Sequence, residues 1–140
     1  MIKTTIKMDW FGGCLNLPIG VWSSAQGKYR WISLTFDTGA SVTTISPEIL
    51  NLLGYVPIEN NKETLTTASG IEYVSRYLLQ SIMIGEIELH DIEAYALKFP
   101  EESYSIGVVG LNVLRQFDIN LMFSRSIIEL CKITSICDDV

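Results

Sequence analysis

Residues 31–46 read WISLTFDTGASVTTIS and place an acid between two segments that both look like strands. Apolar side chains at positions 32, 34 and 36 alternate with polar ones, which is the pattern of a half-buried strand. The run 42–45 is rich in β-branched residues, which favour a second strand. Asp37 therefore lies at a strand-to-turn junction. Gly39 has no Cβ, so it leaves the Asp37 carboxylate open to close approach by backbone amides.

The segment Asp37-Thr38-Gly39-Ala40 has a simpler interpretation as a turn, because Asp, Thr and Gly are all common turn residues. Asp-Thr-Gly followed by Ala or Ser is expected by chance in roughly one chain of this length in a few hundred. The apolar strands predicted on both sides make the match more specific still. We therefore favour a chemical role for Asp37 over a purely structural turn.

These residues resemble the active-site loop of the aspartic proteases, and specifically the small retropepsin-like branch that includes the retroviral proteases. Two later segments extend the resemblance in the same order along the chain. Residues 66–70, TTASG, lie at the tip of a predicted hairpin and look like the flap that covers substrate in this family. Residues 106–118, IGVVGLNVLRQFD, are similar to the family's second conserved block, where a glycine and a short helix lie beside the active-site loop. The resemblance covers roughly residues 28–130.

The resemblance implies an all-β fold, a retropepsin-like closed barrel with one or two short helices and a flap hairpin. A chain of 140 residues that is 48% hydrophobic is large enough for one such domain with a sizeable core. We therefore expect a single domain over residues 1–140. Its N-terminal strands would occupy residues 1–27, and the core that resembles the family would occupy residues 28–130.

Local signals predict where the short helices and an edge strand lie. Ser46 is a favourable N-cap, Pro47 is preferred at the first helical position, and Gly54 ends this helix. Asn112 is positioned to cap a second helix, and Pro18 favours a sheet edge for the strand predicted at 14–22. The apolar side of the second helix is predicted to carry Val113, Leu114 and Phe117.

The resemblance also implies roles within the site. Asp37 would supply one of two carboxylates that share a proton, Thr38 would hydrogen-bond across a two-fold axis, and the Gly39 amide would reach the carboxylate. Asp-Thr-Gly occurs once in the sequence, so a working enzyme would be a homodimer with one Asp37 from each chain. The expected partner is a peptide or protein substrate, and no metal or organic cofactor is called for. The residues expected to bind that substrate are Ala40, Thr67, Ala68, Ser69 and Gly70.

Composition excludes several other classes of function. A net charge of −6 and a pI near 4.7 argue against a nucleic-acid partner, which needs basic clusters. No apolar run is long enough to span a bilayer and no signal peptide is visible, so we expect a cytoplasmic protein without a membrane partner. The spacing of Cys14, Cys131 and Cys137 fits no zinc motif, and His90 has no second ligand near it in the sequence, so no metal site is expected.

The sequence departs from the retroviral members at three positions. Those proteins tend to carry acidic residues after Asp-Thr-Gly-Ala and an arginine after the glycine of the second block, where this chain has Ser41, Val42 and Leu111. Subsite preferences of the viral enzymes therefore do not transfer to this chain. Two other hypotheses stay open: a catalytically silent retropepsin-like module that dimerises or binds peptides, and a monomeric β-barrel that binds a small ligand. Both predict that Asp37→Asn leaves function unchanged.

Overall fold

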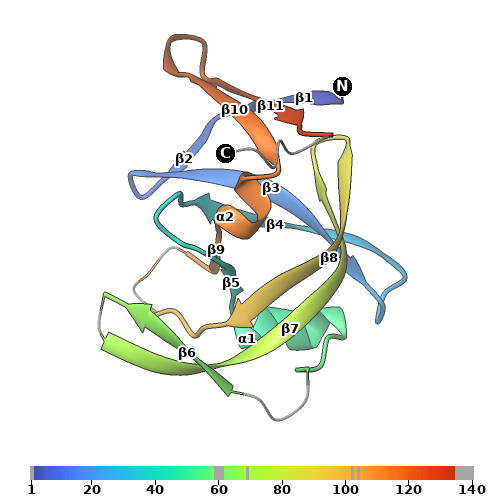
Figure 1. Ribbon diagram of the computed structural model, residues 1–140, viewed down its shortest axis with the longest axis vertical. Helices are drawn as coiled ribbons and strands as arrows, with labels where there is room; N and C mark the ends of the chain where they lie inside the picture. The colour runs from blue at the N-terminus through green and yellow to red at the C-terminus, as the bar shows by residue number, and fades with distance from the viewer. Residues whose placement is uncertain (1, 59–61, 69, 102, 104, 135–140) are drawn as a thin grey trace, which may run out of the picture.

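The computed structural model (Figure 1) describes residues 2–58, 62–68, 70–101, 103 and 105–134. No helix in these ranges is both long and apolar enough to cross a membrane. Strands dominate the described chain, and the elements follow one another as β1 (Lys3–Lys7), β2 (Asp9–Phe11), β3 (Cys14–Ser23), β4 (Lys28–Phe36), β5 (Thr43–Ile45), α1 (Pro47–Leu53), β6 (Lys62–Thr67), β7 (Gly70–Ile84), β8 (Ile87–Ala96), β9 (Gly107–Val109), α2 (Leu111–Leu114), β10 (Phe117–Met122), the 3₁₀ turn η1 (Phe123–Arg125) and β11 (Ile127–Lys132).

Among the described residues the strands form an eight-stranded sheet in the order β2-β3-β4-β9-β5-β8-β7-β6 and a three-stranded sheet in the order β1-β11-β10. The larger sheet curls on itself, because β3 also pairs with β7 through Gly20 with Met83 and Val21 with Ile82. The result is the barrel visible at the centre of Figure 1, with the smaller sheet above it and the β6–β7 hairpin below. The predicted all-β, closed-barrel class with short helices is confirmed.

One continuous apolar core lies inside the barrel and extends under the smaller sheet. Leu17, Leu34 and Leu79 from the barrel are almost fully buried, and so are Ile128 and Leu130 from β11. All five belong to the same cluster of contacting buried side chains. The first and last strands of the described chain, β1 and β11, pair along the whole length of β1 and close this end of the core.

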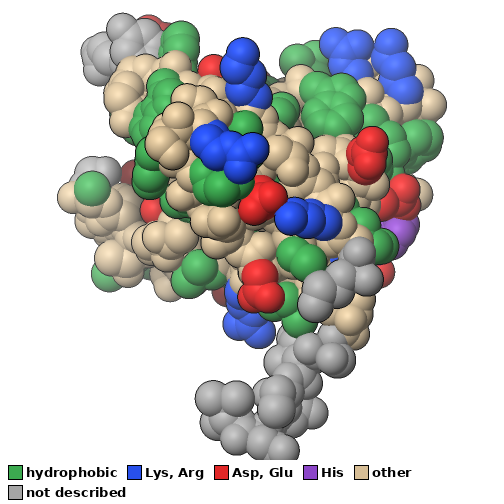
Figure 2. All heavy atoms as spheres, turned by 90° about the horizontal axis from the view of Figure 1, so that it is seen from above, with side chains coloured by type: hydrophobic (Ala, Val, Ile, Leu, Met, Phe, Trp, Pro, Cys, Tyr) green, Lys and Arg blue, Asp and Glu red, His purple; other side chains and the backbone are tan. Residues whose placement is uncertain are grey.

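The outer surface of the smaller sheet is mixed in character. Figure 2 looks onto that end of the molecule and shows basic, acidic and apolar side chains interspersed. Lys3 and Glu129 form an ion pair of 3.0 Å across β1 and β11. At the edge of this sheet Trp10 stacks on Phe123 with ring centroids 6.2 Å apart, although both rings are more than half exposed.

Strand β9 arrives late in the sequence but inserts between two early strands. It runs parallel to β4, pairing Thr35 with Val108, and antiparallel to β5, pairing Thr44 with Val108. Gly107 starts β9 at a point with no room for a side chain, because a Cβ there would lie 2.4 Å from the Thr44 carbonyl oxygen. The insertion places the end of β4, which Asp37 directly follows, against the end of β9.

The first helix forms as the local signals predict. The Ser46 hydroxyl accepts a hydrogen bond from the Ile49 amide at 3.5 Å, and Pro47 is the first helical residue. Gly54 ends the helix with a φ of 93°, in the left-handed region where a glycine avoids the steric cost of a Cβ. Leu50 and Leu53 point into the core.

The second helix is shorter than predicted, and Asn112 does not cap it. Helix α2 covers only Leu111–Leu114, with Gly110 at the capping position, and Phe117 already belongs to β10. The Asn112 side-chain oxygen instead accepts hydrogen bonds from the Thr43 amide at 2.9 Å and the Thr43 hydroxyl at 2.8 Å. The Asn112 amide nitrogen donates to the Glu93 carbonyl at 2.8 Å, so this one side chain ties α2 to β5 and β8.

The strand that contains Pro18 was predicted to lie at a sheet edge, and this holds only in the immediate neighbourhood of Pro18. Strand β3 is internal, because β4 pairs with it from Asn16 to Ser23. On its other side, β2 pairs with it only as far as Asn16 and β7 begins to pair at Gly20. Pro18 falls in the gap between these two neighbours, where no strand requires the backbone N–H that proline lacks.

The bridging role of Asn112 predicts a large effect of Asn112→Ala on stability. The substitution leaves the Thr43 amide and the Glu93 carbonyl without their partner in a mostly buried region, which should lower the free energy of unfolding by about 2–3 kcal/mol. Chemical denaturation of both proteins measures the difference. The matched control is Asn120→Ala, because Asn120 is exposed and its side-chain amide donates to the Glu129 carboxylate on the surface at 3.3 Å. If the two variants are equally stable, Asn112 does not hold these elements together.

Candidate active site

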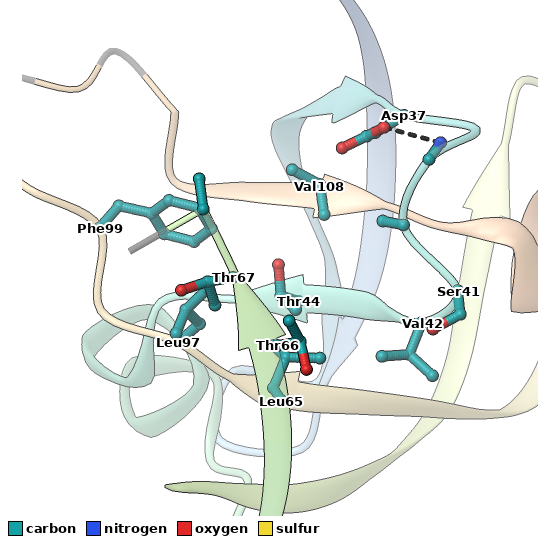
Figure 3. Close-up of a pocket in the computed structure, with 13 residues that line it drawn as sticks. Asp37, Ser41, Val42, Thr44, Leu65, Thr66, Thr67, Leu97, Phe99 and Val108 are labelled. Atoms are coloured by element: carbon teal, nitrogen blue, oxygen red, sulfur yellow. Dashed lines mark hydrogen bonds between the residues drawn. The ribbon is translucent and has the colours of Figure 1, made fainter. Parts of the chain in front are cut away.

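Asp37 is held at the end of β4 by its own backbone and by the turn that follows. Its amide donates to the Val109 carbonyl at 3.2 Å, which continues the pairing of β4 with β9. Its side-chain Oδ1 accepts a hydrogen bond from the Gly39 amide at 2.9 Å, drawn as the dashed line in Figure 3. The sequence predicted this approach of the Gly39 amide, and the geometry confirms it. The carboxylate is thus oriented by the loop while it remains half-exposed.

The Asp37 loop is clamped from the other side by the segment that leads into α2. The Leu111 amide donates to the Ala40 carbonyl at 2.8 Å, and the Asn112 amide donates to the Ser41 carbonyl at 3.2 Å. Gly110 makes this contact possible, since a Cβ on it would lie 2.5 Å from the Val42 carbonyl oxygen. Its amide donates to the Thr43 hydroxyl at 3.1 Å. The two motifs that the sequence analysis linked by resemblance therefore touch through their backbones.

A cavity of about 430 Å³ opens beside the Asp37 carboxylate. Figure 3 shows its walls: the Asp37 loop on one side, β5 and β9 as its floor, and β6 passing across it. Among the described residues that line this cavity, Asp37 is the only charged one. The site is therefore a mainly apolar hollow with several hydroxyl residues in its lining and a single carboxylate at its edge. The described lining residues are Asp37, Gly39, Ala40, Ser41, Val42, Thr44, Leu65, Thr66, Thr67, Ala68, Leu97, Phe99 and Val108.

The cavity brings together most, but not all, of the residues predicted for the site. Asp37 and Gly39 line it together with Ala40, Thr67 and Ala68. Thr38 is exposed at the turn and does not contribute to the lining. Gly70 also stands outside the lining, and its carbonyl accepts a hydrogen bond from the Thr67 hydroxyl at 3.0 Å. Ser69 lies outside the described residues.

Sequence reasoning missed the residues that form the floor and the far wall. Thr44 and Val108 are cross-strand neighbours on β5 and β9, while Leu97 and Phe99 follow β8. No local motif marks these positions. The available signal was alternation, since Thr44 must face away from Thr43 and Ile45 in an extended strand. That signal becomes informative only when the face covered by the β6–β7 hairpin is known.

The β6–β7 hairpin is attached at its base by charged and hydroxyl groups. Strand β6 is at the edge of the sheet, and Glu63 on it contacts Arg76 of β7 at 3.4 Å. The Tyr95 hydroxyl of β8 donates to Glu63 at 3.2 Å, and Arg76 also approaches Glu93 at 3.7 Å. Burial, followed by the negative charges of Glu63 and Glu93, raises the pKa of Tyr95, which keeps its hydroxyl protonated as a donor.

Comparison with known proteins agrees with this geometry. The family model described as gag-polyprotein putative aspartyl protease matches residues 26–116 of the chain. A solved structure described as a retropepsin-like aspartic protease from Rickettsia conorii superposes with a TM-score of 0.67 at 21% sequence identity, covering 92% of this chain and 91% of that one. No curated protein sequence matches the chain.

The family match includes the Asp37 loop and the hairpin, which line the cavity, and the Gly110 segment, which supports the loop. The structural match independently shows the retropepsin-like fold. From these observations, the chain belongs to the gag-polyprotein putative aspartyl protease family and has the retropepsin-like fold.

Proposed function

We propose that the chain is an aspartic endopeptidase whose working unit is a homodimer with one Asp37 from each copy. The observation that carries the proposal is the oriented Asp37 carboxylate, held by the Gly39 amide at 2.9 Å at the edge of an apolar cavity. Aspartic protease chemistry needs two carboxylates, and the described lining of the cavity contains one. A second copy related by a two-fold axis through the loop supplies the other.

The proposed mechanism follows from placing two carboxyl groups close together. Two negative charges at short range repel strongly, so the pair holds one proton over a wide pH range. The ionised Asp37 takes a proton from a water molecule, whose oxygen attacks the carbonyl carbon of the scissile peptide. The protonated Asp37 of the other copy donates to the carbonyl oxygen. Collapse of the tetrahedral intermediate breaks the C–N bond: the first Asp37 gives the nitrogen the proton that it took from water, and a hydroxyl of the intermediate returns a proton to the other Asp37.

The loop and the hairpin have separate proposed roles. Thr38, exposed beside the carboxylate, hydrogen-bonds to the partner copy and holds the two loops in register. The β6–β7 hairpin acts as a flap: Thr67, Ala68, Ser69 and Gly70 close over an extended peptide and offer it backbone hydrogen bonds. The hairpin is attached at its base, and its strand β6 is at the edge of the sheet and, among the described strands, pairs only with β7, which suits an element that opens and closes.

Replacing Asp37 with Asn should abolish peptide cleavage. The substitution keeps the shape of the side chain but removes the group that accepts the proton, so the rate should fall by about 10³-fold or more. Cleavage of a diverse peptide library, read by mass spectrometry, measures the loss. The matched control is Asp91→Asn, because Asp91 is exposed on β8 with a φ of 54° that Asn also tolerates. Cleavage that survives in Asp37→Asn would overturn the proposed function.

Mixing wild-type chain with Asp37→Asn chain should test the shared site. If both carboxylates are required and subunits exchange freely, activity scales with the square of the wild-type fraction. An equimolar mixture at fixed total concentration should then retain about one quarter of the activity, whereas independent monomers would retain about one half. The measurement is the initial rate across a series of mixing ratios. A linear dependence on the wild-type fraction would show that each chain acts alone.

Activity should rise from alkaline toward mildly acidic pH. The mechanism requires one protonated and one ionised carboxyl group, and raising the pH removes the last proton from the pair. The rate constant kcat, measured with one peptide between acid and alkaline pH, reports this loss. Circular dichroism on the same samples checks that the chain stays folded. A rate that is constant across the whole range would contradict a proton-sharing pair.

A further inference from the structure

Thr44 lies at the centre of β5, a three-residue strand whose side chains are all buried. Successive side chains of a strand point to opposite faces, so Thr43 and Thr44 lie in different surroundings. The Thr43 hydroxyl faces α2, where it donates to Asn112 at 2.8 Å and accepts from the Gly110 amide at 3.1 Å. Thr44 faces the cavity and is 4% exposed. Of these two successive threonines, Thr43 therefore contacts α2 within the fold, and Thr44 faces the cavity.

The Thr44 hydroxyl is a buried polar group without a partner. Its Oγ1 makes no hydrogen bond to any described residue, and it is the one described side-chain oxygen or nitrogen in this condition. An unpaired buried hydroxyl costs free energy that a valine of the same shape would avoid. The fold therefore does not account for the hydroxyl at this position. A group that enters the cavity would account for it.

Several of the side chains that line the cavity with Thr44 are apolar. Val108 pairs with it directly across β5 and β9, while Leu65 on β6 and Leu97 after β8 line the same cavity. In Figure 3 the Thr44 oxygen points toward the side of the cavity where Val108 and Asp37 lie. This part of the cavity is a mainly apolar pocket with the Thr44 hydroxyl in its floor, and Thr66 of β6 adds a second hydroxyl residue to the lining.

We propose that Thr44 is a specificity-determining residue that hydrogen-bonds an uncharged polar side chain of the substrate: Asn, Gln, Ser or Thr. The proposal rests on the proposed function, because the ligand is the peptide that lies across Asp37. A hydroxyl both donates and accepts, so it matches an amide or hydroxyl group of the substrate. An acidic side chain is excluded because the described lining carries no positive charge, and a basic one is disfavoured because Asp37, the one charged residue of that lining, is assigned to the scissile peptide.

Access to the hydroxyl depends on the β6–β7 hairpin. Leu65 and Thr66 on β6 cover this side of the cavity, as Figure 3 shows. Opening of the hairpin admits the peptide, and its side chain then replaces the missing hydrogen-bond partner. Polar substrates gain from this contact, and an aliphatic side chain of the same size leaves the hydroxyl unpaired. Selectivity at this subsite therefore arises as much from rejecting aliphatic residues as from binding polar ones.

The test compares wild type with Thr44→Val, which removes the hydroxyl and keeps the shape, and with Thr44→Ser, which keeps the hydroxyl. Each cleaves a peptide library in which every position near the cut is varied, including the near-isosteric pair Asn and Leu. We expect wild type to prefer Asn over Leu at one position by about threefold to tenfold in kcat/KM. Thr44→Ser should keep this preference, Thr44→Val should lose or reverse it, and preferences at the other positions should not change.

A second measurement separates recognition from turnover. Binding of the same Asn and Leu peptides to Asp37→Asn chain, with and without Thr44→Val, reports selectivity when no bond is cut. If wild type fails to cleave but this binding preference depends on Thr44, the proposed catalysis fails and the recognition stands. A polar preference that is absent, or that survives Thr44→Val in both assays, overturns the proposal.

Thermal unfolding supplies an independent check on the role of the hydroxyl. Because Thr44→Val removes an unpaired buried polar group, its Tm should equal or exceed that of wild type by a few degrees. A Tm several degrees lower would mean that the hydroxyl is bonded within the fold. That result would overturn the assignment of Thr44 to substrate recognition.

Discussion

The contact between two backbones, the Asp37 loop and the segment from Val109 to Asn112, is the constraint on which the site depends. Amide-to-carbonyl bonds run in both directions across it, from Asp37 to Val109 and back from Leu111 and Asn112 to Ala40 and Ser41. These bonds require a separation that only a residue without a side chain permits, and Gly110 provides it. The position of the carboxylate is therefore set by main-chain geometry.

The polar groups around β5 show how one short strand serves both architecture and recognition. On one face, Thr43 and Asn112 satisfy each other and the Gly110 amide, so their burial costs little and fixes α2 in place. On the other face, Thr44 is left without a partner beside the cavity. A buried polar network whose hydrogen bonds are all made favours one fold over others. An unpaired polar group in a cavity wall favours a ligand that can hydrogen-bond to it.

Features determined by neighbours in sequence were predictable, and features determined by distant segments were not. Ser46, Pro47 and Gly54 act within one helix, so its limits could be deduced from their positions. The turn chemistry of Asp37 and Gly39 is equally local. The role of Asn112 depends on Thr43 and Glu93, which reach it only through the folded sheet, and its sequence position suggested a cap instead. The cavity floor was missed for the same reason, because Val108 and Thr44 become neighbours only when β9 inserts.

That insertion also dictates an order of assembly. Strands β4 (Lys28–Phe36) and β5 (Thr43–Ile45) do not pair with each other. Strand β9 (Gly107–Val109) lies between them. Contacts so far apart in sequence form slowly, because a long loop must close first. During synthesis, which proceeds from the N-terminus, the Asp37 loop stays without its support until residues 107–112 have left the ribosome. Asp37 is thus made early, but its carboxylate is held in its final position only late. The site therefore forms only after most of the barrel has been synthesised.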